Sequence, residues 1–144
     1  MTFKRAVVVV IGMSSTGICR TASAQEKSQW DGVYTQDQAR RGRDLFYEHC
    51  LRCHEADLKG SVGPCLVCDE FSAKWNGLAL GQLFDRIGQT EPRDHPGILS
   101  REMTADILSF MLLTLGAPAG PTELPTQSEV LGTIKYIATN PTSN

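Results

Sequence analysis

Hydrophobic residues recur at helical spacing in three stretches of this 144-residue chain. The first stretch follows Thr35 and forms one helical face from Ala39, Gly42, Leu45 and Phe46. Thr35 and Gln38 have the spacing of a capping box, in which each side chain covers a backbone amide of the other residue. The pattern therefore predicts a helix that begins after Thr35 and ends near His49.

The other two stretches are also amphipathic. The shorter one forms a stripe from Leu80, Leu83, Phe84 and Ile87. The longer one is a ladder at four-residue spacing, made of Met103, Ile107, Met111 and Leu115 and flanked by Leu108 and Leu112. Ladder positions are normally core positions, so we expect both methionines to pack in the core. Either Ser100 or Thr104 caps this helix, and Gly116 and Pro118 end it near Leu115.

Gly42 lies inside the first predicted helix, where glycine costs about 1 kcal/mol relative to alanine. A close approach of a second backbone would explain it, and simple tolerance is the alternative. We expect the third helix to cross the first near Gly42.

Glycine and proline interrupt the segments between the helices. Residues 55–72 lose helical periodicity and predict a loop that wraps around something, and residues 89–99 predict a second loop. A short helical turn is expected at residues 72–76. After an extended strap at 117–125, Thr126 and Glu129 give a capping signature that predicts a brief helix over residues 127–137 and a disordered end at 139–144.

These elements predict an all-α protein with three main helices and long loops. We expect residues 25–34 to form a lead-in with a turn at Asp31-Gly32. Residues 35–120 form the predicted main domain, and residues 121–144 form the strap and the short helix with its disordered end. At this length one domain is expected.

The N-terminus has the pattern of an export signal. Lys4 and Arg5 precede a short apolar run over residues 6–13, and Ala22-Ser23-Ala24 supplies small residues before Gln25. The pattern predicts a signal peptide over residues 1–24 and a periplasmic protein, with an uncleaved anchor as the alternative. A lipoprotein site at Cys19 fits less well, because Ile18 stands where a small residue is expected. No apolar run of about 18 residues predicts a membrane span in the mature chain.

Removal of residues 1–24 changes the charge balance. It takes away Lys4, Arg5 and Arg20, so 14 − 3 = 11 basic residues face 16 acidic ones, a net charge of −5. This balance argues against nucleic-acid binding and favours a protein partner with a positive patch. Four cysteines remain after Cys19 leaves with the signal, and in an oxidising compartment we expect them to be held in covalent bonds.

The strongest chemical motif is Cys50-Leu51-Arg52-Cys53-His54. Two thiols three residues apart can add to the two vinyl groups of a haem, and the adjacent imidazole can bind the iron. A disulfide between Cys50 and Cys53 is one alternative. A zinc site that also uses Cys65 and Cys68 is another, although only eleven residues separate the two pairs and His54 would have no role. For Cys65 and Cys68 we favour a local disulfide.

With this motif at the end of the first of three helices, the chain resembles a class I cytochrome c over about residues 32–138. It is similar in particular to cytochromes that accept electrons from periplasmic quinoprotein (pyrroloquinoline-quinone-type) alcohol dehydrogenases. The similar segments are Trp75-Asn76-Gly77, Leu83-Phe84-Asp85-Arg86-Ile87, Pro96-Gly97-Ile98-Leu99-Ser100, Asp106-Ile107, Pro118-Ala119-Gly120 and Glu123-Leu124-Pro125.

The resemblance implies one haem c, attached through Cys50 and Cys53, with His54 as the proximal iron ligand. It places residues 35–120 in a cytochrome c domain. Trp75 is then either a core aromatic or a residue whose indole N–H reaches a haem propionate.

The second axial position departs from the family pattern. The family's distal methionine precedes a proline in the loop before the last helix, and here Glu91 precedes Pro92. Four interpretations stay open: Glu91, His95 or Met103 binds the iron, or the site is open or occupied by water. The choice matters because the axial ligand sets the redox potential over about 0.8 V.

The resemblance favours a non-enzymatic carrier of single electrons. Its expected partners are a periplasmic quinoprotein dehydrogenase as donor and an oxidase or another cytochrome as acceptor. The alternative is a haem protein with an open sixth site that binds small ligands or has peroxidase-like activity. A hydrolase is not indicated, because no sequence context makes His49, His54 or His95 a general base.

Overall fold

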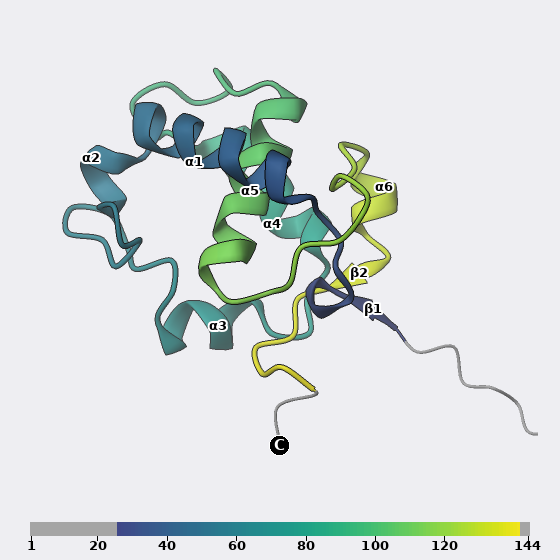
Figure 1. The fold of residues 1–144 in the computed structure, drawn as a ribbon. Coiled ribbons are helices and arrows are strands. Elements are labelled where there is room, and N and C mark those ends of the chain that lie inside the picture. The colour runs from purple at the N-terminus through teal and green to yellow at the C-terminus, as the bar shows by residue number, and fades with distance from the viewer. Residues whose placement is uncertain (1–25, 142–144) are drawn as a thin grey trace, which may run out of the picture.

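The computed structural model describes residues 26–141 and is mostly helical within them (Figure 1). The longer helices are α1 (Gln36–His49), α4 (Leu80–Thr90) and α5 (Arg101–Thr114), and the shorter ones are α2 (Leu51–His54), α3 (Asp69–Trp75) and α6 (Ser128–Leu131). A 3-10 turn, η1 (Gln29–Asp31), and two short strands, β1 (Lys27–Ser28) and β2 (Ile134–Lys135), complete the regular structure of this part of the chain. The all-α prediction is therefore confirmed. The predicted signal peptide, Cys19 and residues 142–144 lie outside the described residues.

The start of α1 follows its predicted cap only in part. The Thr35 hydroxyl accepts a hydrogen bond from the Gln38 amide at 3.1 Å, as expected. The Gln38 side chain does not return this bond: it is buried and bonds the backbone of Leu124 in both directions, at 3.1 Å and 2.6 Å. A buried amide side chain needs partners for both its donor and its acceptor, and the distant strap supplies both.

Ser100 is the residue that caps α5. Its hydroxyl accepts a hydrogen bond from the Met103 amide at 3.2 Å, whereas the Thr104 hydroxyl lies inside the helix and donates to the Ser100 carbonyl. Met111 is buried as predicted, but Met103 is only half-buried near the start of the helix.

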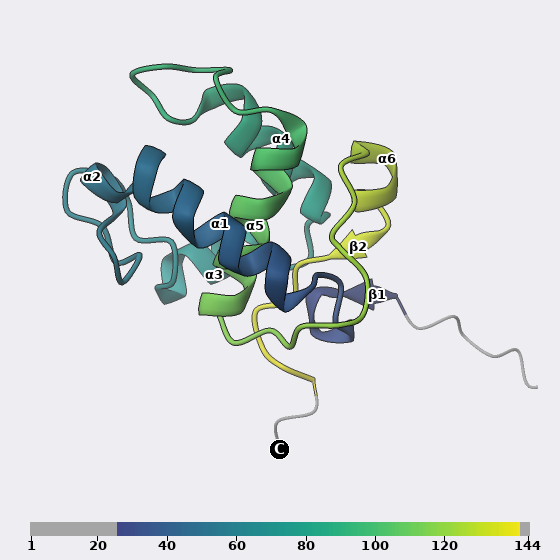
Figure 2. The ribbon, with the colours of Figure 1, turned by 45° about the horizontal axis from the view of Figure 1, so that its top comes forward.

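The predicted crossing of α1 and α5 at Gly42 is confirmed (Figures 1 and 2). A Cβ atom at Gly42 would overlap the Asp106 carbonyl group of α5, so only glycine fits this contact. The rings of Phe46 and Phe110 extend the interface, with their centroids 5.4 Å apart. The contact between α1 and α5 thus fixes the position of the C-terminal end of α1, where Cys50 follows.

The C-terminal segment is where the prediction was wrong. The helix expected over residues 127–137 ends at Leu131, and residues 134–135 form β2, which pairs in parallel with β1. The expected capping signature is not formed either: Gln127 precedes α6 without a side-chain cap, and the Ser128 hydroxyl donates to Asp85 at 2.8 Å.

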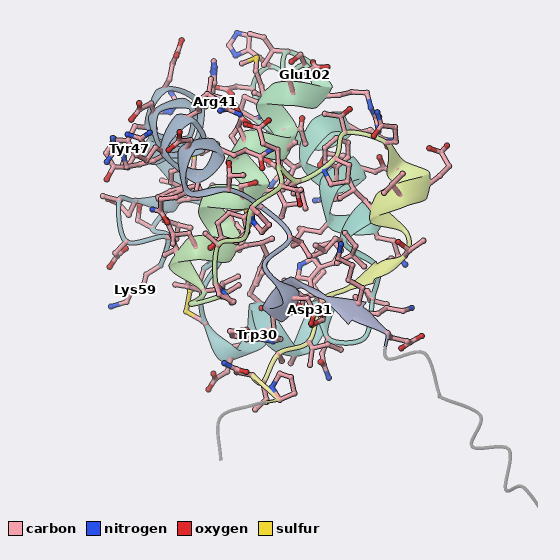
Figure 3. All side chains as sticks on the ribbon, turned by 45° about the vertical axis from the view of Figure 1, so that its right-hand side comes forward. Trp30, Asp31, Arg41, Tyr47, Lys59 and Glu102 are labelled. Carbon is pink, nitrogen blue, oxygen red and sulfur yellow. A yellow bond between two sulfur atoms is a disulfide. The ribbon has the colours of Figure 1, made fainter. Side chains whose placement is uncertain are left out.

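The lead-in explains this difference. Gln29 bonds the backbone of Ile137 in both directions, at 2.6 Å and 2.9 Å, and the Trp30 indole donates to the same carbonyl at 2.8 Å. Figure 3 labels Trp30 and Asp31 of this lead-in. The backbone hydrogen-bonding groups of Ile137 are thus satisfied by residues distant in sequence. The C-terminal segment therefore forms an extended pairing with the lead-in instead of continuing the helix.

Two boundaries also differ from the prediction. The turn expected at residues 72–76 is the longer α3, and α4 continues to Thr90. No helix within residues 26–141 has the length and apolar character to cross a bilayer.

Candidate cofactor site

One helical turn brings together Cys50, Cys53 and His54. The Cys50 amide closes α1 by donating to the Phe46 carbonyl at 2.8 Å, and Cys50 then starts α2. The amides of Cys53 and His54 both donate to the Cys50 carbonyl, at 3.1 Å and 3.0 Å. The two cysteines are free thiols and are half-buried. The end of α1 therefore presents two thiols and an imidazole from adjacent positions.

The following loop holds the His54 ring. The Nδ1 atom lies 2.9 Å from the Pro64 carbonyl oxygen, which can only accept, so Nδ1 carries the proton. The lone pair of Nε2 is then available to a metal ion, and the hydrogen bond fixes the orientation of the ring. Gly63 lies against the ring, since a Cβ atom there would be 2.8 Å from Cε1.

A disulfide joins Cys65 and Cys68 next to Pro64. These two sulfur atoms are therefore not thiolates that could complete a zinc site with Cys50 and Cys53. Moreover, no three or more His, Cys, Asp and Glu side chains within residues 26–141 are grouped to hold a metal ion. The zinc interpretation of the cysteine pairs is therefore not supported. Haem iron takes only its axial ligands from the protein, so the lack of such a group of side chains does not argue against haem binding.

Two cavities adjoin this turn. The first has a volume of about 410 Å³ and a mainly apolar wall formed by Phe46, Leu66, Phe71, Trp75, Leu83, Ile87, Ile107 and Met111. The second has a volume of about 440 Å³ and extends past Cys53 and Gly63 to Pro92, Arg93 and Asp94. Both volumes are in the range of small-molecule and cofactor sites.

Five residues line both cavities: Cys50, His54, Pro64, Arg86 and Glu91. Glu91 is the residue that ends α4, its amide donates to the Ile87 carbonyl at 3.0 Å, and its side chain is 25% exposed. A guanidinium nitrogen of Arg86 lies 3.8 Å from a Glu91 carboxylate oxygen.

Burial and nearby charges affect the pKa of the Cys50 thiol. Burial, followed by the charges of Glu91 and Cys53, raises the pKa of Cys50 to about 12. The thiol is therefore neutral at physiological pH.

The other predicted site residues are placed differently. Trp75 is buried and lines the first cavity, with the Lys74 ammonium 5.4 Å from its ring centroid. The His95 side chain is 72% exposed beside Asp94 and lines neither cavity. Met103 packs against the core and also lines neither. The structure thus brings Glu91, but not His95 or Met103, to the cavities that His54 lines.

Several residues of the site were not identified from the sequence. The position of Gly63 before Pro64 in a loop was visible as a turn signal, but nothing local indicated that the Pro64 carbonyl meets His54. Arg86 lies five residues before Glu91, which is not one of the i, i+3 or i, i+4 spacings of helix ion pairs, so no local signal indicated this contact. Met111 was assigned to the core and also forms part of a cavity wall.

Charged side chains of both signs line the second cavity. Arg52, Arg86 and Arg93 line it together with the carboxylates Glu91 and Asp94, and Arg52 pairs with Asp94 at 3.0 Å. Beside them Val62 is 82% exposed. The net charge of the mature chain suggested a partner with a positive patch, but arginines outnumber carboxylates in the lining of this cavity.

No protein-family model matches this sequence, and no curated protein is significantly similar to it. Among solved structures, one match is the crystal structure of the sulfane dehydrogenase SoxCD from Paracoccus pantotrophus. The two chains are 22% identical with a TM-score of 0.46, and the match covers 72% of this chain and 60% of that chain. This chain therefore spans less than two thirds of the length of the chain it matches, and a likeness of this size assigns neither family nor function.

Proposed function

We propose that this chain is a periplasmic monohaem c-type cytochrome of the class I fold that carries single electrons between protein partners. The observation that carries the proposal is the group at the end of α1. Two free thiols and an imidazole lie on one helical turn, and the imidazole has its Nδ1 atom held at 2.9 Å by Pro64. Cys50 and Cys53 would hold the haem through thioethers, and His54 would bind its iron.

The residues around this group fit a haem. The apolar wall of the first cavity would pack against the hydrophobic ring of the haem, and Trp75 and Lys74, which line the same cavity, would offer an indole N–H and an ammonium to a propionate. When bound, the haem supplies the Fe(II)/Fe(III) couple. The protein contributes the orientation of the His54 ring, the low-polarity surroundings and the route to the surface.

The second cavity supports a role in transfer rather than storage of electrons. Cys53 lines it together with Val62, Arg52 and Arg93, so a partner that docks on these residues would lie close to the Cys53 thioether. Within the proposal the donor is a quinoprotein dehydrogenase, and the acceptor is an oxidase or another cytochrome. The support for these partners is the resemblance of the sequence segments described above.

The test is expression of the full chain with its export signal in a bacterium that has a periplasmic cytochrome c maturation system. The proposal expects haem that stays with the protein after acid–acetone extraction and an absorption spectrum that changes reversibly on reduction. Cys50→Ala or Cys53→Ala should abolish double attachment, and His54→Ala should lose the iron ligand and most of the haem-loaded protein.

A double variant, Cys65→Ser with Cys68→Ser, is the matched control. It also removes two sulfur atoms, but it should retain covalent haem because these cysteines are joined to each other. Extractable haem in the unmodified protein, or normal attachment in both single variants at Cys50 and Cys53, would overturn the proposal.

A further inference from the structure

Five residues line both cavities, and on the premise that the proposed haem is present, each can be weighed as a second iron ligand. Of the five, Cys50 supplies a thioether and His54 the first axial ligand. The Pro64 carbonyl accepts from His54, and the Arg86 guanidinium carries only hydrogen-bond donors and offers no lone pair to a metal ion. The Glu91 carboxylate is the remaining donor at the position where the two cavities meet.

Other side chains with ligating atoms have less favourable positions. Lys74, Glu70 and Met111 line only the first cavity, and His49 and Asp94 line only the second. His95 is exposed on the surface, and Met103 packs against the core near the start of α5. None of these residues shares both cavities with His54.

The backbone and Arg86 both position Glu91. The Glu91 amide donates a hydrogen bond to the Ile87 carbonyl, so Glu91 is the last residue held by the backbone of α4. The 3.8 Å ion pair with Arg86 keeps its carboxylate close to the same helix. A side chain that is three quarters buried loses most of its solvation, and Arg86 offsets part of that loss.

We propose that the Glu91 carboxylate is the second axial ligand of the ferric iron bound by His54, with Arg86 as the residue that holds it in position. A hard anionic oxygen binds Fe(III) more strongly than Fe(II), so this ligand lowers the redox potential relative to a thioether. In the reduced protein the carboxylate would bind the iron less strongly, so an external ligand such as carbon monoxide would compete with it more easily.

The experiment compares purified haem-loaded variants by absorption and electron paramagnetic resonance spectroscopy of the ferric state, by redox potentiometry and by ligand titration. Glu91→Gln keeps the size of the side chain and removes its charge, and Glu91→Ala removes the ligand altogether. Both should change the ferric spectrum and raise the midpoint potential. Imidazole should bind the ferric protein at least about ten times more tightly, since it no longer competes with the carboxylate.

Arg86→Gln should give a smaller change in the same direction, because the carboxylate remains but is less well held. His95→Ala and Met103→Leu are the controls and should leave the spectrum and the potential unchanged. An unchanged ferric spectrum and imidazole affinity in both Glu91 variants would overturn the inference, as would a change caused instead by Met111→Leu. Covalent haem in the unmodified protein separates this failure from failure of the proposed function, in which no protein would carry attached haem.

Discussion

The imidazole of His54 lies against two consecutive loop residues, Gly63 and Pro64. Its Nδ1 atom is 2.9 Å from the Pro64 carbonyl oxygen, and a Cβ atom on Gly63 would come within 2.8 Å of the ring. One residue thus fixes the tautomer and the other leaves space for the ring. The loop of residues 55–68 thus fixes the tautomer and the orientation of His54, as a hydrogen-bond partner commonly does for a metal-binding histidine.

Gly63→Ala should displace the ring. The added methyl group overlaps His54, and such overpacking costs about 1–3 kcal/mol. A weaker bond to Pro64 makes Nε2 less basic, so we expect a lower yield of haem-loaded protein and a higher midpoint potential. Pyridine haemochrome assay and potentiometry measure both. Val62→Ala is the control in the same loop, because Val62 is 82% exposed; equal effects of the two substitutions would contradict this role of Gly63.

The disulfide between Cys65 and Cys68 should contribute to stability rather than to haem attachment. For a loop this short the loss of chain entropy in the unfolded state corresponds to about 2 kcal/mol. Denaturant titration of the Cys65→Ser, Cys68→Ser double variant should show a fall of this size in the free energy of unfolding. Thiol titration of the denatured exported protein should find no free thiol before reduction and two after it. Two free thiols before reduction would show that the bond does not form.

The helices were predictable because their signals are local. The apolar stripes and the caps at Thr35 and Ser100 depend on neighbours within one or two turns, and these gave α1, α4 and α5. The crossing at Gly42 was also predictable, since an interior glycine is unfavourable without a close neighbour. The strands were not, because Lys27 and Ile134, which are 134 − 27 = 107 positions apart, pair there. Strands of two residues carry no alternating pattern.

The site divides in the same way. The spacing of Cys50, Cys53 and His54 is a property of one helical turn, so the sequence indicates it directly. Which candidate ligand lines the same cavities as His54 depends on the path of the chain after α4, and sequence reasoning left Glu91, His95, Met103 and an open or water-bound site as alternatives. Only the fold separates them, since it brings Glu91 to both cavities and leaves His95 on the surface.

Tyr34 should make the protein sensitive to alkaline pH. Its side chain is fully buried, its hydroxyl donates to the Ala117 carbonyl at 2.5 Å, and burial raises its pKa to about 12. In the unfolded chain a tyrosine has a pKa of about 10. The folded-state pKa is the higher one, so this contribution to stability is complete below about pH 10 and is lost as the pH rises toward 12.

Tyr34→Phe should therefore reduce the fall in the free energy of unfolding between pH 10 and 12. At neutral pH the variant should lose about 1 kcal/mol, because the Ala117 carbonyl loses its partner. Denaturant titrations at a series of pH values measure both effects. Burial also raises the pKa of Tyr136, so part of the alkaline loss should remain. Tyr47→Phe, at an exposed position, is the control, and an alkaline loss of full size in Tyr34→Phe would contradict the assignment.

Two adjacent arginines of α1 should differ in their contribution to stability. Arg41, labelled in Figure 3, forms two hydrogen bonds of 2.9 Å with Asp106 of α5 and a third of 2.9 Å with Glu123. These bonds raise the pKa of Arg41 above its ordinary value, so the guanidinium remains charged. The Asp106 side chain is only 12% exposed. Arg40 pairs with Asp37 on the same helix, and both of those side chains are exposed.

Arg41→Ala should lower the free energy of unfolding by about 1–3 kcal/mol, because it leaves the mostly buried Asp106 carboxylate without its bidentate partner. Arg40→Ala should cost no more than about 0.5 kcal/mol, as expected for an exposed ion pair. In about 1 M salt the Arg40 effect should vanish and most of the Arg41 effect should persist, since screening acts mainly on exposed charges. Equal losses in the two variants, or loss of both effects in salt, would show that the Arg41 pair does not stabilise the crossing of α1 and α5.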